Sequence, residues 1–196
     1  AILTPAQNPR GEAMMISINL VIVWAMFERE LSLAEAHQYC RQLAESHYEN
    51  FSIASRLIPN ELRLDFFNIY AYCRWSDDLA DEQATPAIAL DALGQWRKRL
   101  KSSLAGQSSD NPILTALTDT VKRRKLATQP LLDLLDAFEQ DQSVHRYASR
   151  TEVLDYCRRS ANPVGRLILG LAGISGTTEV AYSDSICTGL QLVNFC

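Results

Sequence analysis

Apolar residues recur at helical spacing along most of the chain, and nowhere do they alternate with polar residues for long. The clearest case is the run Ala89, Leu93, Trp96, Leu100 and Leu104, with steps of four, three, four and four. Such spacing places all five side chains on one face of a helix. Similar runs follow along the rest of the chain. The pattern predicts an all-α fold, in which helices pack around one core.

Helix-start signals divide this pattern into segments. Ser32-Leu-Ala-Glu35 is a capping box and predicts a helix that runs to about His47. Thr85 before Pro86, and Asn111 before Pro112, combine a capping side chain with proline in the first turn. These signals predict helices that begin at 86 and 112, and Pro130 begins a further one.

Three further boundaries are less sharply marked. Asn60 is predicted to cap a long helix, and Thr151 is predicted to cap another that runs to Leu171 with a kink at Pro163. A last helix is expected from about Thr178 to the final residue, Cys196.

The segment Ile69–Glu82 combines a long apolar run with three aspartates in five positions, and neither glycine nor proline interrupts residues 60–83. In a helix, residues three and four apart lie on one face. Arg74, Asp77, Asp78 and Asp81 therefore form one patch, with Tyr70 one turn before Arg74. Two carboxylates one turn apart suit Mg²⁺, which completes its shell with waters and substrate phosphates.

A solvated acidic helix end is the alternative interpretation of this patch. Two features count against it. Acidic residues near a helix C-terminus oppose the helix dipole, and Asp77 to Glu82 stand just before Thr85 and Pro86. The residues around them are tyrosine, cysteine, tryptophan and leucine, which is typical of a wall of the core.

Composition limits the class of protein. The 196 residues, 47% of them apolar and 21% charged, fit one domain with a sizeable core, and the net charge of −4 gives no basic footprint for nucleic acid. Five widely spaced cysteines without a CxxC motif favour reduced thiols and a cytoplasmic protein.

The first 31 residues differ from the remainder. Their apolar run, 16–27, contains Asn19 and is too short to span a bilayer comfortably. We interpret 1–31 as an atypical N-terminal extension and 32–196 as the domain. The alternative is a targeting or membrane-associating segment.

Polar residues interrupt the apolar faces of several later helices. Asp141 is followed by Arg146 and Tyr147, and a later helix carries Gln191 and Asn194 three residues apart. Each of them alone is most simply a surface residue. Together with the aspartate patch, they could line one polar-rimmed cavity inside an apolar bundle.

The chain resembles the squalene and phytoene synthase family, through five blocks that occur in the family's order. The form of the first and fourth blocks is most similar to the bacterial hopanoid branch. The blocks are His47-Tyr-Glu-Asn-Phe-Ser-Ile-Ala-Ser55, Tyr70-Ala-Tyr-Cys-Arg-Trp-Ser-Asp-Asp-Leu-Ala-Asp-Glu82, Phe138-Glu-Gln-Asp141 with Arg146 and Tyr147, Tyr156-Cys-Arg-Arg-Ser-Ala-Asn-Pro-Val-Gly165, and Gly189-Leu-Gln-Leu-Val-Asn-Phe195.

The resemblance implies an isoprenoid synthase fold, a helical bundle around an apolar cavity, with Mg²⁺ held by two aspartate-rich motifs on facing helices. It assigns metal binding to Asp77, Asp78 and Asp81. The residues implied to act in catalysis are Asp77, Asp81, Arg74 and Tyr156, and those implied to bind substrate are Asn50, Phe51, Tyr70, Val164, Gly165, Gln191 and Asn194.

In the family, a second acidic motif follows the block that contains Gln191 and Asn194. This sequence ends at Cys196 before any such motif. We therefore expect the second metal motif to lie beyond Cys196, and the 196-residue chain itself to be poorly soluble and to have little or no activity.

The activity implied by the resemblance is Mg²⁺-dependent ionisation of presqualene diphosphate to hydroxysqualene. Condensation of two prenyl diphosphates, to presqualene diphosphate or phytoene, is the alternative reaction. A non-catalytic assembly factor is a third interpretation. A prenyl diphosphate substrate, a peripheral membrane contact for an apolar product and other enzymes of the hopanoid pathway are the partners implied.

Overall fold

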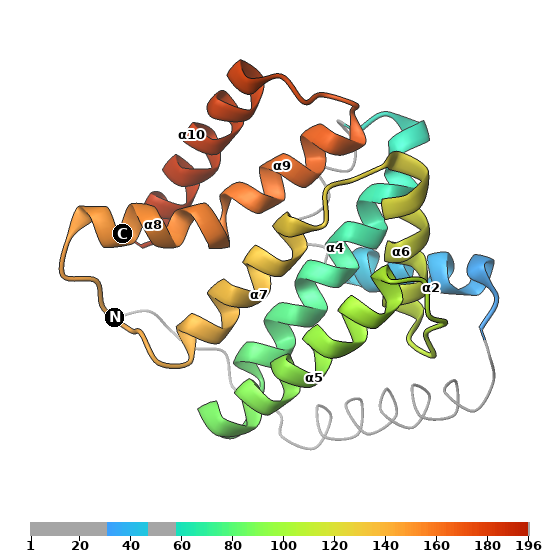
Figure 1. Cartoon of the computed structure of the whole chain (residues 1–196), viewed down its shortest axis with the longest axis horizontal. Helices are drawn as coiled ribbons and strands as arrows, with labels where there is room; N and C mark the ends of the chain where they lie inside the picture. Colours follow the sequence, from blue (N-terminus) through green and yellow to red (C-terminus); the bar gives the residue numbers. More distant parts are fainter. Residues whose placement is uncertain (1–30, 47–57, 196) are drawn as a thin grey trace, which may run out of the picture.

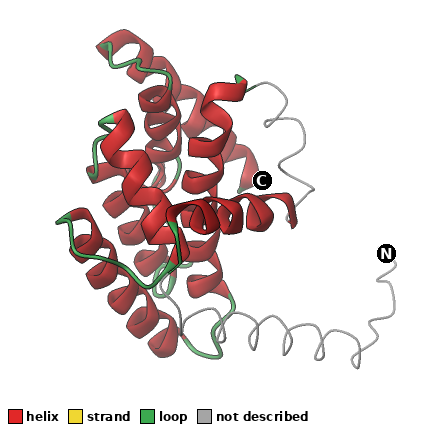
Figure 2. Ribbon diagram, turned by 90° about the vertical axis from the view of Figure 1, so that its right-hand side faces the viewer, coloured by secondary structure: helices red, strands yellow, loops and turns green. Residues whose placement is uncertain are grey.

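Every regular element in the described part of the chain is an α-helix (Figures 1 and 2), which confirms the all-α prediction. The computed structural model describes residues 31–46 and 58–195, so the expected extension 1–31 lies almost wholly outside it. Within these ranges the helices are α2 (Leu33–Ser46), α4 (Asn60–Asp81), α5 (Pro86–Leu104), α6 (Pro112–Arg124), α7 (Gln129–Asp141), α8 (Arg150–Ser160), α9 (Asn162–Leu171) and α10 (Thr177–Asn194).

The strong capping signals predict their helices correctly. Ser32 and Glu35 form the reciprocal capping box, with Ser32 N donating to the Glu35 carboxylate at 2.9 Å and Glu35 N donating to Ser32 Oγ at 3.3 Å. Thr85 Oγ1 accepts from Ile88 N, and Asn111 Oδ1 accepts from the first two amides of the next turn. These side chains satisfy amides that have no partner within the helix.

The weaker signals were wrong in detail. Pro59 occupies the cap position before α4, so Asn60 is the first helical residue and makes no cap hydrogen bond. Ser149, not Thr151, caps α8 by accepting from Glu152 N at 3.3 Å. The last helix ends at Asn194, with Phe195 as its C-cap.

The predicted kink at Pro163 is a complete break. α8 ends at Ser160 and α9 begins at Asn162, with proline in the first turn of α9. Proline has no amide hydrogen and its ring collides with the preceding turn, so the helical ladder stops before it and a new one starts.

Helix α4 lies at the centre of the fold. It contacts α2, α5, α6, α7 and α9 (Figure 1). Tyr72 is fully buried, its hydroxyl donates to the Leu131 carbonyl at 2.7 Å, and its ring stacks on Trp96 with centroids 6.2 Å apart. Trp96 Nε1 donates in turn to Ser76 Oγ at 3.0 Å. These contacts fix α4 against α5 and α7 and give the buried Tyr72 hydroxyl and Trp96 indole N–H a hydrogen-bond partner each.

One charged group is buried inside the apolar part of α4. Asp65 is 1% exposed and receives Arg124 Nε at 2.7 Å, Arg123 Nη2 at 2.5 Å and Thr120 Oγ1 at 3.0 Å. Burial acts to raise the pKa of Asp65, but the hydrogen bonds from the two arginines outweigh it and the pKa lies below its ordinary value. The carboxylate therefore joins α4 to the end of α6 as a compensated charge.

Helix α10 lies at the edge of the bundle, mainly against α9 and α8 (Figure 1). None of its residues is buried. Its outward side exposes apolar side chains, the most exposed being Tyr182, Ile186, Leu190 and Val193. Within the described ranges, no helix has the length and apolar content needed to cross a bilayer.

Replacement of Gly165 by alanine is expected to lower stability. A Cβ at this position would lie 2.4 Å from Ser183 Oγ and 2.6 Å from Cys187 Sγ, on the facing side of α10. We expect a loss of about 1–3 kcal/mol, as for other overpacked contacts, measured by urea unfolding. Gly94→Ala is the matched control, because its new Cβ meets nothing within 4 Å. In a helix this substitution should raise the free energy of unfolding by up to about 1 kcal/mol. Equal stabilisation by both substitutions would contradict the close contact of α9 with α10.

Candidate functional site

The aspartate patch forms at the C-terminal end of α4, as the helical spacing predicted. Arg74 Nη2 lies 2.5 Å from Asp78 Oδ1, and Arg74 Nη1 lies 3.3 Å from Asp77 Oδ2. Asp81 is the last residue of the helix and is exposed, while Asp77 and Asp78 are half-buried. Asp78 is thus the main partner of Arg74, and Asp77 and Asp81 stand nearer to water.

The charge of this patch is only partly compensated. Burial raises the pKa of Asp77 above its ordinary value, and the neighbouring Asp81 raises it further, although Arg74 acts in the opposite direction. The end of a helix also carries partial negative charge. Carboxylates held together in this way favour binding of a cation, because a cation relieves their mutual repulsion.

A fourth carboxylate, Asp141, joins the site from the end of α7. Tyr156 of α8 donates its hydroxyl to Asp141 Oδ2 at 2.7 Å. Burial raises the pKa of Asp141, and the charge of Asp81 raises it further, so the two helix ends lie close enough to interact electrostatically. Gln142 strengthens this approach by donating its Nε2 to the Ala80 carbonyl of α4 at 3.1 Å.

The sequence placed Asp141 among the polar residues that could line one cavity with the aspartate patch, but only Tyr156 was assigned a part in catalysis. The signal for Asp141 was present in the Phe138-Glu-Gln-Asp141 block, but an isolated carboxylate at a helix end is normally a surface residue. Burial and the hydrogen bond also raise the pKa of Tyr156. Its phenol therefore stays protonated and donates to Asp141 at neutral pH.

Three aromatic rings pack together at Tyr156, the residue that donates to Asp141. Tyr156 lies 5.3 Å from Tyr147 and 5.9 Å from Phe195, measured between ring centroids. Phe195 directly follows α10, so the C-terminal end of that helix reaches the ring of Tyr156. This contact joins the end of α10 to Tyr156 of α8 and to Tyr147 of the preceding loop.

The remaining predicted residues have different surroundings. Tyr70 is half-buried one turn before Arg74, and burial raises its pKa. Val164 is 38% exposed, and Gly165 lies against α10. Gln191 is half-buried whereas Asn194 is exposed, so the two do not share one environment. Asn50 and Phe51 lie outside the described residues.

The carboxylates at the end of α4 fit a magnesium ion whose other ligands are water and phosphate oxygens. In the described part of the chain, no three histidine, cysteine, aspartate or glutamate side chains are gathered closely enough to hold a metal by themselves. Asp77 and Asp81 supply oxygen donors, and Mg²⁺ commonly uses one or two carboxylates with water and phosphate oxygens. Arg74 Nε is buried and has no hydrogen-bond partner among the described residues.

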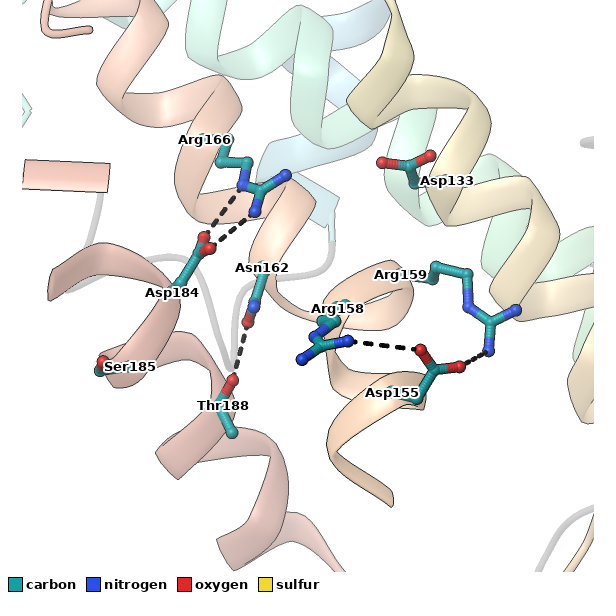
Figure 3. A pocket seen from close by; sticks show the side chains of 9 residues that line it. All are labelled: Asp133, Asp155, Arg158, Arg159, Asn162, Arg166, Asp184, Ser185 and Thr188. Carbon is teal, nitrogen blue, oxygen red and sulfur yellow. Dashed lines mark hydrogen bonds and ion pairs between the residues drawn. The ribbon is translucent and has the colours of Figure 1, made fainter. Parts of the chain in front are cut away.

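A separate cavity of about 600 Å³ lies between α7, α8, α9 and α10 (Figure 3). Three arginines and three aspartates line it, and five of these six residues form ion pairs: Arg166 with Asp184, and Arg158 and Arg159 with Asp155. The charges cancel, and the lining has no apolar wall for a hydrocarbon chain. The cavity is therefore a poor candidate for binding a prenyl diphosphate.

Comparison with known proteins defines the class. The fold matches the squalene synthase HpnC of Alicyclobacillus acidocaldarius with a TM-score of 0.78 and 39% identity, over 87% of this chain and 64% of that one. A dehydrosqualene synthase shares the fold with a TM-score of 0.71 at 24% identity, over 83% of this chain and 56% of that one. The chain thus has the isoprenoid synthase fold of these enzymes.

The family model for squalene/phytoene synthase matches residues 44–196, and the chain belongs to this family. It is 38% identical to the hydroxysqualene synthase of Zymomonas mobilis over 74% of the chain and 48% of that protein. It is 32% identical to the chloroplastic phytoene synthase 1 of Zea mays over 96% of the chain and 53% of that protein. The chain spans about half the length of the curated relatives that it matches.

The raised pKa of Asp77 predicts that Asp77→Asn stabilises the metal-free chain. A carboxyl whose pKa is raised by folding stabilises the fold below its ordinary value of 3.8, and this contribution is lost as pH rises through the raised pKa. The melting temperature of the variant should exceed that of the unchanged chain by about 1–3 °C at pH 7. The difference should shrink as pH falls toward 4.

The matched control is Asp65→Asn, whose effect should have the opposite sign. It removes the charge that pairs with Arg123 and Arg124, and loss of one partner from a buried ion pair costs about 3–5 kcal/mol. Thermal unfolding followed by circular dichroism over pH 4–8 measures both variants. Destabilisation by Asp77→Asn at pH 7 would show that its carboxylate is fully compensated in the fold.

Proposed function

We propose that the protein to which this chain contributes converts presqualene diphosphate to hydroxysqualene. The observation that carries this proposal is the group formed by Asp77, Asp81 and Asp141 beside Arg74, at one end of an apolar helical bundle. The pKa values of Asp77 and Asp141 are raised, and a group of carboxylates beside a cationic guanidinium suits an ion-bridged diphosphate. The identities of 36–39% to hydroxysqualene synthases and to the squalene synthase HpnC support this branch of the family.

In the proposed reaction, the bond between carbon and the diphosphate oxygen breaks, and its electron pair leaves with the diphosphate. The cyclopropylcarbinyl cation that results rearranges, with cleavage of a ring carbon–carbon bond, to an allylic cation. Water adds to this cation and loses one proton, giving hydroxysqualene and inorganic diphosphate. No reductant is required. Bound Mg²⁺, held by Asp77 and Asp81, would neutralise the charge that develops on the leaving group.

The chain's own side chains have separate parts in this proposal. Arg74 is held by Asp78 and donates to the leaving diphosphate, which gains negative charge as the bond breaks. The rings of Tyr147 and Phe195 pack against Tyr156, which bonds to Asp141, and the three rings offer π-faces to a cation. The Tyr156 phenol stays protonated and gives its hydrogen bond to Asp141.

Condensation of two prenyl diphosphates is the second candidate. The match to the phytoene synthase of Zea mays, which covers 96% of the chain, favours it. Both candidates use the same diphosphate end of the site. They differ in whether a second prenyl diphosphate or water reacts with the carbocation.

Product analysis separates these candidates. A chimaera can continue the chain with the part of the Zymomonas mobilis hydroxysqualene synthase that follows its matched region. We expect it to convert presqualene diphosphate, in the presence of Mg²⁺, to hydroxysqualene detectable by gas chromatography and mass spectrometry. Release of presqualene diphosphate or phytoene from farnesyl or geranylgeranyl diphosphate, with no hydroxysqualene, would favour condensation. Turnover of none of these substrates would overturn both candidates.

Asp81→Ala in the same chimaera tests the role of the aspartate patch. We expect turnover to fall about 100-fold, because one of the two proposed magnesium donors is lost. Helicity at 222 nm should be unchanged, since Asp81 is exposed at the last position of α4. The neighbouring substitution Glu82→Ala removes an equal charge outside the helix and should change turnover little. Equal effects of the two substitutions would mean that the patch is only a solvated helix end.

A further inference from the structure

Helix α10 carries Gln191, one of the residues that the resemblance implies to bind substrate, and has little apolar packing of its own. None of its residues is buried, and its exposed side includes Ile186 at 64% and Val193 at 71% exposure. Only one narrow face is half-buried, and the residues of this face between 183 and 192 are Ser183, Asp184, Cys187, Thr188, Gln191 and Leu192. Few apolar contacts therefore fix the rotation of α10 about its axis.

Two polar contacts join this face to α9 (Figure 3). Arg166 makes a two-pronged ion pair with Asp184, with Nε at 3.0 Å and Nη2 at 2.6 Å from the two carboxylate oxygens. Thr188 Oγ1 donates to Asn162 Oδ1 at 2.9 Å, and Asn162 is 4% exposed. A two-pronged guanidinium–carboxylate pair is directional, so it constrains orientation as well as distance.

The spacing of these contacts relates them to the aspartate site. Asp184, Thr188, Gln191 and Phe195 follow one another at steps of four, three and four, so they share one face of the helix. Phe195, at the far end of this face, contacts the ring of Tyr156. A rotation of α10 that broke the pair of Arg166 and Asp184 would also turn Gln191 and Phe195 away.

We propose that Arg166 and Asp184, together with Asn162 and Thr188, are positioning residues. They set the rotation of α10 and thereby direct Gln191 toward the end of the bundle that holds Asp141 and Tyr156. The part that refers to catalysis rests on the proposed function, whereas the orientation of α10 does not. None of these four residues belongs to the aspartate patch.

The same cavity supplies a control. Arg159 pairs with Asp155 at 2.8 Å within α8, one turn apart, and this contact does not involve α10 (Figure 3). Arg159→Gln therefore removes an arginine and an ion pair from the cavity without removing a contact to α10. Both substitutions replace arginine by glutamine. The Arg166 guanidinium joins α9 to α10, whereas the Arg159 guanidinium pairs with a residue of its own helix.

The test is nuclear Overhauser contact between the Phe195 and Tyr156 rings in the chimaera with the Zymomonas mobilis enzyme. We expect Arg166→Gln and Asp184→Asn to weaken this contact at least about threefold and to shift the side-chain amide signals of Gln191. Arg159→Gln should leave both unchanged. The pair is partly exposed, so the melting temperature should fall by no more than about 3 °C. The exchanged pair Arg166→Asp with Asp184→Arg should restore the ring contact.

Unchanged ring contacts in both Arg166→Gln and Asp184→Asn would overturn the proposal, as would an equal loss in Arg159→Gln. In the chimaera, Arg166→Gln should lower kcat about tenfold with the concentration of Mg²⁺ required for half-maximal rate unchanged, because Asp77 and Asp81 lie on α4. A general loss of stability would not lower kcat while leaving the required Mg²⁺ concentration unchanged. If the unsubstituted chimaera were inactive, the proposed function would fail, and the ring contacts would still decide how α10 is oriented.

Discussion

The structure depends on one constraint on α4: this helix is packed on several sides and yet ends in three aspartates. Its neighbours α2, α5, α6, α7 and α9 cover its length, and Tyr72 and Trp96 fill the space where α5 and α7 meet it. Fixing α4 so firmly keeps Asp77 beside Asp78 and Asp81, whose charges act against its ionisation. The stability of the bundle thereby supports a local arrangement that is unfavourable in itself.

The contrast between Asp65 and Asp77 shows how one helix treats two carboxylates differently. Asp65 is deeply buried, and two guanidiniums and a hydroxyl compensate it. Asp77 is less buried, but it shares one arginine with Asp78 and stands near Asp81 and Asp141. The first arrangement joins helices together. The second leaves negative charge that an added cation can neutralise, which is the physical basis of the proposed diphosphate chemistry.

Sequence signals predicted the helices well where the stabilising contacts lie within one helical turn. The capping box at Ser32 and the caps at Thr85 and Asn111 each act within one turn, and the structure confirms them. The patch of Arg74 and its aspartates also follows from spacing alone. Choosing between two neighbouring candidates is harder, because Ser149 and Thr151 are both good caps and only the path of the preceding loop decides between them.

Contacts between residues far apart in the sequence could not be predicted in this way. The approach of Asp141 to Asp81 depends on how α7 lies against α4, and the hydrogen bond from Gln142 to Ala80 is invisible in the sequence. Gln191 and Asn194 have the spacing of one helix face, yet the structure half-buries the first and exposes the second. The reason is that Asp184 and Thr188 fix the rotation of α10 through α9. A motif therefore identifies which residues share a helix, while contacts made one or two turns away determine which of them face the site.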